Sequence, residues 1–150
     1  VHILFIIKYE KVFAMNISKR EKLLTILNKK AIKHNEVPVS CIITKDDKII
    51  SKAYNNKITK HDPTAHAEII AIRKAAKKLK TWNLNECKLY VTLYPCKMCL
   101  DVINEARIKE VYYILDNEKE INNNVKITKI NSEKNKYFQE ELKGFFKNKR

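Results

Sequence analysis

The sequences HDPTAHAE at residues 61–68 and YPCKMC at residues 94–99 decide how this chain is interpreted. Together they hold His66, Cys96 and Cys99, an imidazole and two thiols of the kind that bind zinc. Structural zinc sites usually close their shell with a fourth Cys or His, whereas catalytic sites keep three protein ligands and an open position. The residues therefore predict one zinc ion per chain, held in a catalytic site.

The spacing of the ligands predicts that two helices begin at the metal. Pro95 suits the first position of a helix, and Cys96 and Cys99 then lie on one face of its first turn. His66 and Glu68 stand in the opening turn of a second helix, about 200° apart at about 100° per residue. Glu68 reaches the site only if the end of that helix lies over it. We therefore expect two helix N-termini to dock around one ion.

These motifs resemble the signature of the zinc-dependent nucleoside and nucleobase deaminases, which pairs H-x-E with P-C-x-x-C. Within that cytidine and deoxycytidylate deaminase family, four stretches of this chain closely resemble bacterial tRNA adenosine deaminases. They are residues 36–39 (EVPV), 54–55 (YN), 61–68 and 145–146 (FF). Two departures stand out. Tyr94 replaces a usual Glu, and Ser40 replaces a usual Gly. The connector after the fourth expected strand is also shorter than in relatives.

The resemblance implies a hydrolase that converts adenosine to inosine and ammonia at the wobble position of a tRNA anticodon loop. It implies that Glu68 moves protons between a zinc-activated water, the ring nitrogen and the departing amine. It also implies a homodimer, because relatives often complete each other's pockets. The residues for which it implies substrate contacts are Val39, Asn55, Ala67, Leu93 and Phe146.

Several of these residues also have plainer interpretations. Asn55 suits a turn, Val39 and Leu93 suit a core, and Phe146 suits the packed face of a helix. A small-molecule deaminase acting on cytosine, guanine or a nucleoside would share the same zinc site. A non-catalytic zinc subunit of an editing complex would share its ligands. Glu68 argues against that subunit, because a structural site has no use for the carboxylate.

The composition favours a polyanionic partner such as RNA. The chain has 31 Lys and Arg against 17 Asp and Glu, which gives a net charge of +14. The basic residues are spread over every segment, so this argument is supporting only. Thiolate ligands must stay reduced, which predicts a cytoplasmic location, and Cys41 and Cys87 are expected to be buried rather than paired in disulfides. The apolar run at residues 3–7 is too short to span a bilayer, so no membrane association is expected.

Hydrophobic periodicity predicts one α/β domain over residues 15–150. Helices are expected over residues 17–35, 65–80 and 96–106 and after Ser132, and strands over 39–44, 49–53, 88–93, 110–115 and 125–130. This alternation predicts a three-layer α/β/α cytidine-deaminase-like fold with a five-stranded mixed sheet.

The two ends of the chain carry further expectations. Residues 1–14 are expected to be a disordered or non-native extension before Met15, with an added strand or a membrane-surface anchor as alternatives. A Ser-x-x-Glu capping box at residues 18–21 is expected to start the first helix. The stripe formed by Phe138, Leu142, Phe145 and Phe146 is expected to lie on the core.

Overall fold

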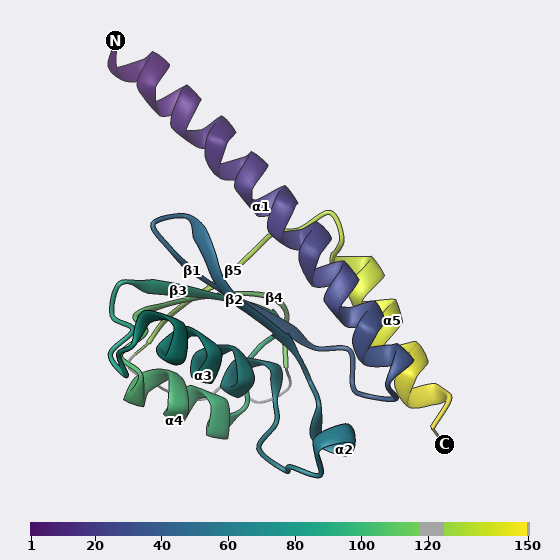
Figure 1. The fold of residues 1–150 in the computed structure, drawn as a ribbon. Helices are drawn as coiled ribbons and strands as arrows, with labels where there is room; N and C mark the ends of the chain where they lie inside the picture. The colour runs from purple at the N-terminus through teal and green to yellow at the C-terminus, as the bar shows by residue number, and fades with distance from the viewer. Residues whose placement is uncertain (118–124, 150) are drawn as a thin grey trace.

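One mixed sheet organises the chain. The computed structural model describes residues 1–117 and 125–149, with only the backbone described for residues 11–16. The strand order is β2-β1-β3-β4-β5 (Figure 1). β1 (Ser40–Lys45) pairs antiparallel with both β2 (Lys48–Tyr54) and β3 (Cys87–Leu93). β4 (Glu110–Leu115) and β5 (Lys126–Lys129) extend the sheet in parallel, which confirms the expected five-stranded mixed sheet.

Helices cover both faces of this sheet (Figure 1). α1 (His2–Lys33) and α5 (Asn135–Lys147) lie side by side on one face. α3 (Ala67–Leu79) and α4 (Lys97–Glu105) lie on the other. The four-residue helix α2 (Lys57–Lys60), between β2 and α3, is an element that the sequence did not predict. The expected three-layer α/β/α architecture is confirmed.

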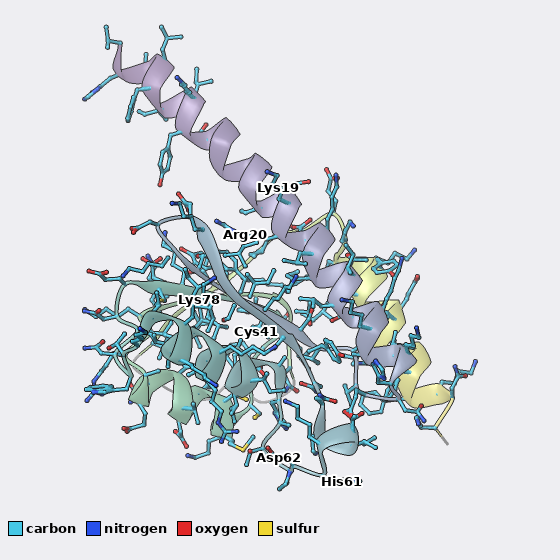
Figure 2. All side chains as sticks on the ribbon, in the orientation of Figure 1. Lys19, Arg20, Cys41, His61, Asp62 and Lys78 are labelled. Atoms are coloured by element: carbon cyan, nitrogen blue, oxygen red, sulfur yellow. The ribbon has the colours of Figure 1, made fainter. Side chains whose placement is uncertain are left out.

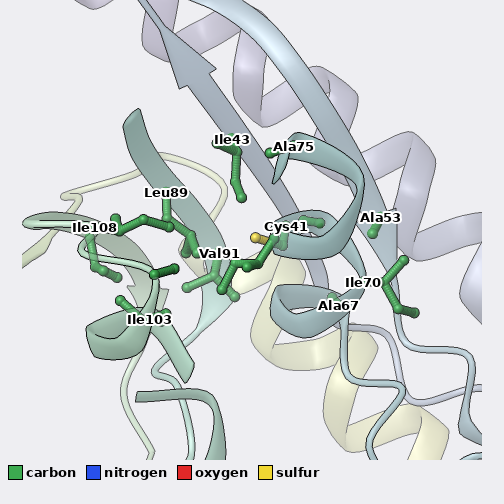
Figure 3. Packing of buried hydrophobic residues seen from close by; sticks show 14 of the residues in the cluster. Cys41, Ile43, Ala53, Ala67, Ile70, Ala75, Leu89, Val91, Ile103 and Ile108 are labelled. Atoms are coloured by element: carbon green, nitrogen blue, oxygen red, sulfur yellow. The ribbon is translucent and has the colours of Figure 1, made fainter. Parts of the chain in front are cut away.

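Alternate strand residues face the two helical layers, as the two-residue period of a strand requires. In β1, Cys41 and Ile43 join the core beneath α3 and α4 (Figure 3). Ile42 points to the opposite face and packs in a second core with Phe138 of α5. Cys41 and Cys87 are both buried free thiols, which confirms the expectation for these two cysteines.

A two-residue turn joins β1 to β2 without a glycine. Asp46 and Asp47 adopt positive φ values of 51° and 60°, a conformation that Asp tolerates better than most residues. Arg20 of α1 lies over this end of the sheet (Figure 2). Its guanidinium donates to Asp47 at 3.3 Å and to the Tyr90 hydroxyl at 2.8 Å. These contacts attach α1 to both the turn and β3.

α1 is longer than predicted. It begins at His2, so the expected capping box at residues 18–21 lies inside the helix instead of starting it. The first turns project beyond the sheet (Figure 1), and the side chains of residues 1–10 are exposed. The suggestion that residues 1–14 are a disordered or non-native extension stays a prediction. Of the described helices, none is both long and apolar enough to cross a membrane.

Three helix starts differ from the predictions by one or two residues. α3 begins at Ala67 rather than at residue 65. α4 begins at Lys97 with Cys96 as its N-cap, so Pro95 precedes the cap and does not occupy the first helical position. α5 begins at Asn135 rather than directly after Ser132. The Ser132 hydroxyl accepts the N–H of Lys134 at 3.0 Å, which makes a local turn that leads into the helix.

The apolar stripe of α5 reaches the core in part. Phe138 is 1% exposed and Leu142 packs at the edge of the same core. Phe146 is 49% exposed, so its expected place in the core is wrong. Most of the expected polar connector, residues 118–124, lies outside the described residues.

Candidate metal centre and active site

His66, Cys96 and Cys99 meet where two helices begin. His66 is the N-cap of α3, Cys96 is the N-cap of α4, and Cys99 lies in the first turn of α4. The two caps have extended backbone, with ψ values of 151° and 169°, before each chain enters its helix. The metal-binding atoms of the three residues all lie within 4.8 Å of one another. The two helix N-termini therefore dock around one point, as the spacing predicts.

The distances within this cluster fit a tetrahedral zinc site. With a Zn–S bond of about 2.3 Å and a Zn–N bond of about 2.0 Å, a tetrahedron places nitrogen and sulfur ligands about 3.5 Å apart. His66 Nδ1 is 3.6 Å from Cys96 Sγ and 3.5 Å from Cys99 Sγ. One nitrogen and two sulfurs fill three corners and leave the fourth open to water.

Hydrogen bonding couples Cys96, Cys99 and His66 to one another. Hydrogen bonds with Cys99 and His66 lower the pKa of Cys96 to about 4, so Cys96 is a thiolate at neutral pH. The hydrogen bond with Cys96 raises the pKa of Cys99, and burial raises it further. The bond with Cys96 also raises the pKa of His66, against the effect of burial. Because metal ligands are thiolates and neutral imidazoles, binding of a divalent cation must release the protons that this cluster holds.

Glu68 supplies a buried carboxyl group beside the cluster. It lies in the first turn of α3 and is 3% exposed. Burial raises its pKa, while its own backbone N–H and the charge of His66 oppose that rise. Its carboxyl group also interacts with the Cys99 thiol. A buried carboxyl group with a raised pKa is suited to accept and return a proton, as general acid–base catalysis requires.

The loop from β2 to α3 brings three of the expected substrate residues together. Asn55 is 8% exposed, and its Oδ1 accepts the N–H of Ala67 at 2.8 Å. Its own N–H donates to the carbonyl oxygen of Val39 at 3.0 Å. The next residue, Asn56, donates its N–H to the Ala65 carbonyl at 2.9 Å. Asn55 therefore holds the first residue of α3, a structural role in addition to any contact with a substrate.

The other two expected substrate residues lie together elsewhere. Leu93 and Phe146 both line a cavity of about 480 Å³, which Val39, Asn55 and Ala67 do not line. Leu93 ends β3, three residues before Cys96, so the cavity adjoins the strand end that leads into the cysteine motif. The exposed side chain of Phe146 faces this cavity. The five residues thus form two groups, one at the start of α3 and one at the carboxyl end of β3.

Glu36 has a role in this region that the sequence analysis missed. It is 1% exposed, and its carboxylate accepts the N–H groups of Ile58 at 2.6 Å and Thr59 at 3.1 Å. These donors belong to the first turn of α2, so Glu36 fixes the segment that leads from Asn55 to the metal ligands. In the sequence Glu36 stands out only as the first residue of the EVPV stretch that carries the family resemblance, and its partners lie in a helix that the sequence did not predict.

The sequence of the chain is also similar to those of known deaminases. A family model described as MafB19-like deaminase matches residues 7–150. A tRNA-specific adenosine deaminase of Buchnera aphidicola is 39% identical over 132 residues, which cover 80% of this chain and 87% of that protein. Its counterpart in Aquifex aeolicus is 48% identical over 85 residues, or 57% of this chain and 56% of that protein. The chain therefore covers little more than half of the Aquifex relative.

Two further comparisons concern substrate and fold. A guanine deaminase of Bacillus subtilis is 50% identical over 76 residues, which cover 51% of this chain and 49% of that protein. A solved structure from work on A-to-I editing by tRNA:A34 deaminases matches this chain with a TM-score of 0.69 and 29% identity. The matched region covers 73% of this chain and 95% of the chain in that structure. The fold is thus that of the cytidine-deaminase-like proteins. With a metal-ligand cluster, an adjacent buried carboxyl group and a family match over most of its length, the chain belongs to the MafB19-like deaminase family.

Proposed function

We propose that the protein is a zinc-dependent hydrolase that deaminates adenosine to inosine at the wobble position of tRNA. The observation that carries this proposal is the cluster of His66, Cys96 and Cys99, with N···S distances of 3.6 and 3.5 Å, beside the buried Glu68. The tRNA substrate is supported by the Buchnera relative, most of which the chain covers, and by the structural neighbour from the tRNA:A34 work.

Glu68 is the catalytic acid and base in this proposal. His66, Cys96 and Cys99 would hold a zinc ion, which would make an activated water available at neutral pH. Glu68 would accept one proton of the water that adds to C6 of adenine and would pass it to the ring nitrogen. It then carries the second proton to the exocyclic amine, which leaves as ammonia while C6 keeps the oxygen. The raised pKa of Glu68 suits a group that must both accept and release protons.

Asn55 positions the base in this proposal. Its Oδ1 is engaged by the Ala67 N–H, so its amide NH₂ is the part that donates to the substrate. Val39 and Ala67 flank it and form the apolar walls of the base pocket. Leu93 and Phe146 serve a different part of the substrate, because the cavity they line suits a nucleotide next to the reacting one. An anticodon loop is single-stranded, so its bases can be extruded for such contacts.

A small-molecule deaminase is the second candidate, and one observation favours it. The guanine deaminase of Bacillus subtilis is 50% identical over its matched segment, so the ligand motifs are compatible with a free base. The non-catalytic zinc subunit has less support, because the buried Glu68 has no function in a structural site. We place the enzyme in the cytoplasm, where thiolate ligands stay reduced. A homodimer stays a prediction, to be measured by light scattering after gel filtration.

One incubation separates these candidates. Purified zinc-loaded protein is given an anticodon stem-loop RNA with adenosine at the wobble position and, in parallel, free guanine and free cytosine. We expect inosine in the digested RNA, detected by mass spectrometry, and no inosine in a stem-loop with guanosine at that position. Formation of xanthine or uracil with the RNA left unmodified would replace this proposal with the small-molecule one.

A further inference from the structure

Four lysines from four separate elements line one cavity of about 210 Å³. They are Lys30 of α1, Lys52 of β2, Lys60 of α2 and Lys74 of α3, and we call this cavity the lysine pocket. Its remaining lining residues are Leu27, Ala53, Tyr54, Asn56 and Ile70, so no acidic side chain lines it within the described part of the chain. The fold thus gathers positive charge from positions far apart in the sequence.

Among the described residues, no carboxylate pairs with the lysines of the lysine pocket. Lys74 Nζ donates to the carbonyl oxygen of Lys52 at 3.2 Å, which holds one ammonium group at the pocket. Burial, together with the charges of Lys60 and Lys52, lowers the pKa of Lys74. Ammonium groups that repel one another in this way favour a bound anion.

The lysine pocket adjoins the candidate active site through a shared loop. Tyr54 and Asn56 line the pocket, and Asn55 between them holds Ala67 at the start of α3. Asn56 also donates its N–H to the carbonyl oxygen of Ala65, the residue before the metal ligand His66. A group bound in the pocket therefore lies against the same loop that shapes the site for the base.

We propose that the lysine pocket binds a backbone phosphate of the RNA substrate, close to the nucleotide that is deaminated. This inference rests on the proposed function, because it requires RNA as the substrate. Lysine ammonium groups bind phosphates as point charges and carry no sequence preference. The pocket would therefore fix the position of the RNA strand while the base is read elsewhere.

Two double variants, each of which removes two lysines, test whether the position of the lost charge matters. The test variant is Lys60→Ala with Lys74→Ala. The control is Lys77→Ala with Lys78→Ala, two exposed α3 residues that do not line the pocket; Figure 2 shows Lys78 away from the loop that holds Asp62. Thermal melting of all three proteins checks that the fold is kept. Binding of the wobble-adenosine stem-loop is measured between about 50 and 200 mM salt, together with its deamination rate.

We expect the test variant to raise the KM for RNA about tenfold with kcat unchanged. In a plot of the logarithm of the RNA binding constant against the logarithm of the salt concentration, the slope should become shallower by about 0.7 for each phosphate that loses its ammonium partner. The control should stay within about twofold of wild type. A test variant that matches the control would overturn the proposal, because the lysines would then act only through the net charge of the protein.

Two further outcomes show whether the bound anion comes from RNA, and whether a negative result refutes this inference alone or the proposed function as well. Inorganic phosphate is added in a melting series to both double variants and to wild type. If phosphate stabilises wild type and the control but not the test variant, and RNA binding is equal in all three, the pocket takes a free anion and the RNA assignment is wrong. Wild-type protein that neither binds nor edits the stem-loop refutes the proposed function as well, whereas editing with no effect of the test variant refutes this inference alone.

Discussion

Substitution of Asn55 separates its structural role from its proposed contact with the base. Asn55→Ala removes the acceptor for the Ala67 N–H, which is 2.8 Å away at a site where Asn55 is 8% exposed. Leaving a buried donor unpaired costs about 1–3 kcal/mol. In a domain of this size, about 2 kcal/mol lowers Tm by about 4–8 °C. We therefore expect Asn55→Ala to lose stability and activity together.

Asn55→Asp removes only the donor function. The new carboxylate keeps an acceptor in the same place, at the N-terminus of α3 where negative charge is favoured. It lacks the NH₂ group that the proposal assigns to the base. We expect its Tm to lie closer to that of wild type than Asn55→Ala does. Leaving the acceptor of the base without a donor costs about 1–3 kcal/mol, which should lower kcat/KM for RNA by about 5- to 150-fold.

Thermal unfolding of the zinc-loaded proteins and initial deamination rates on the stem-loop check both expectations. A wild-type Tm for Asn55→Ala would show that the bond to Ala67 does not support α3. A wild-type rate for Asn55→Asp would show that the amide NH₂ does not contact the base. Either result refutes one role without touching the other.

Three other predictions concern the acid, the buried anchor and the metal ligands. Glu68→Gln should keep one zinc per chain by elemental analysis while deamination falls by about 10²–10⁴-fold, and a wild-type rate would contradict the proton-transfer role. Glu36→Ala should lower the free energy of unfolding by about 1.5–3 kcal/mol in urea, since the N–H groups of Ile58 and Thr59 lose the carboxylate that accepts them; an unchanged midpoint would contradict the anchoring of α2. Zinc affinity should rise with pH, because the raised pKa values of Cys99 and His66 mean that these groups hold protons which binding must release. Calorimetry in buffers of different ionisation enthalpy measures that release, and equal heats would argue against it.

The metal cluster was predictable because its geometry is set by local spacing. Cys96 and Cys99 are fixed by a single helical turn, and the start of α3 needs only to be placed opposite for His66 to complete the cluster. The helix starts themselves were less certain from sequence. Pro95 suits both the position before the cap and the first helical position, so local preference does not choose between them.

Features that depend on contacts between distant segments were not predictable in the same way. Phe146 continues a helical apolar stripe, yet the helix turns it towards a cavity instead of the core. Glu36 belongs to the EVPV stretch of the family resemblance, but its role as an anchor depends on the two N–H donors that α2 provides. The lysine pocket is hidden for the same reason, because its four residues stand in four elements and one of those elements is α2. A scattered excess of lysine gave no indication that four would meet.

The two departures from the family pattern lie in the supports of the site and not in its ligands. Tyr94 packs edge-on against Tyr113 with 5.0 Å between ring centroids, and its N–H donates to the Leu115 carbonyl at 2.8 Å. Ser40 is fully buried in β1, and its hydroxyl donates to the Leu24 carbonyl of α1 at 3.1 Å. Tyr94 therefore packs against a neighbouring strand, whereas Ser40 forms a hydrogen bond from the sheet to the helical layer of α1. Neither replacement removes one of the three ligands or Glu68, all of which lie at the starts of α3 and α4.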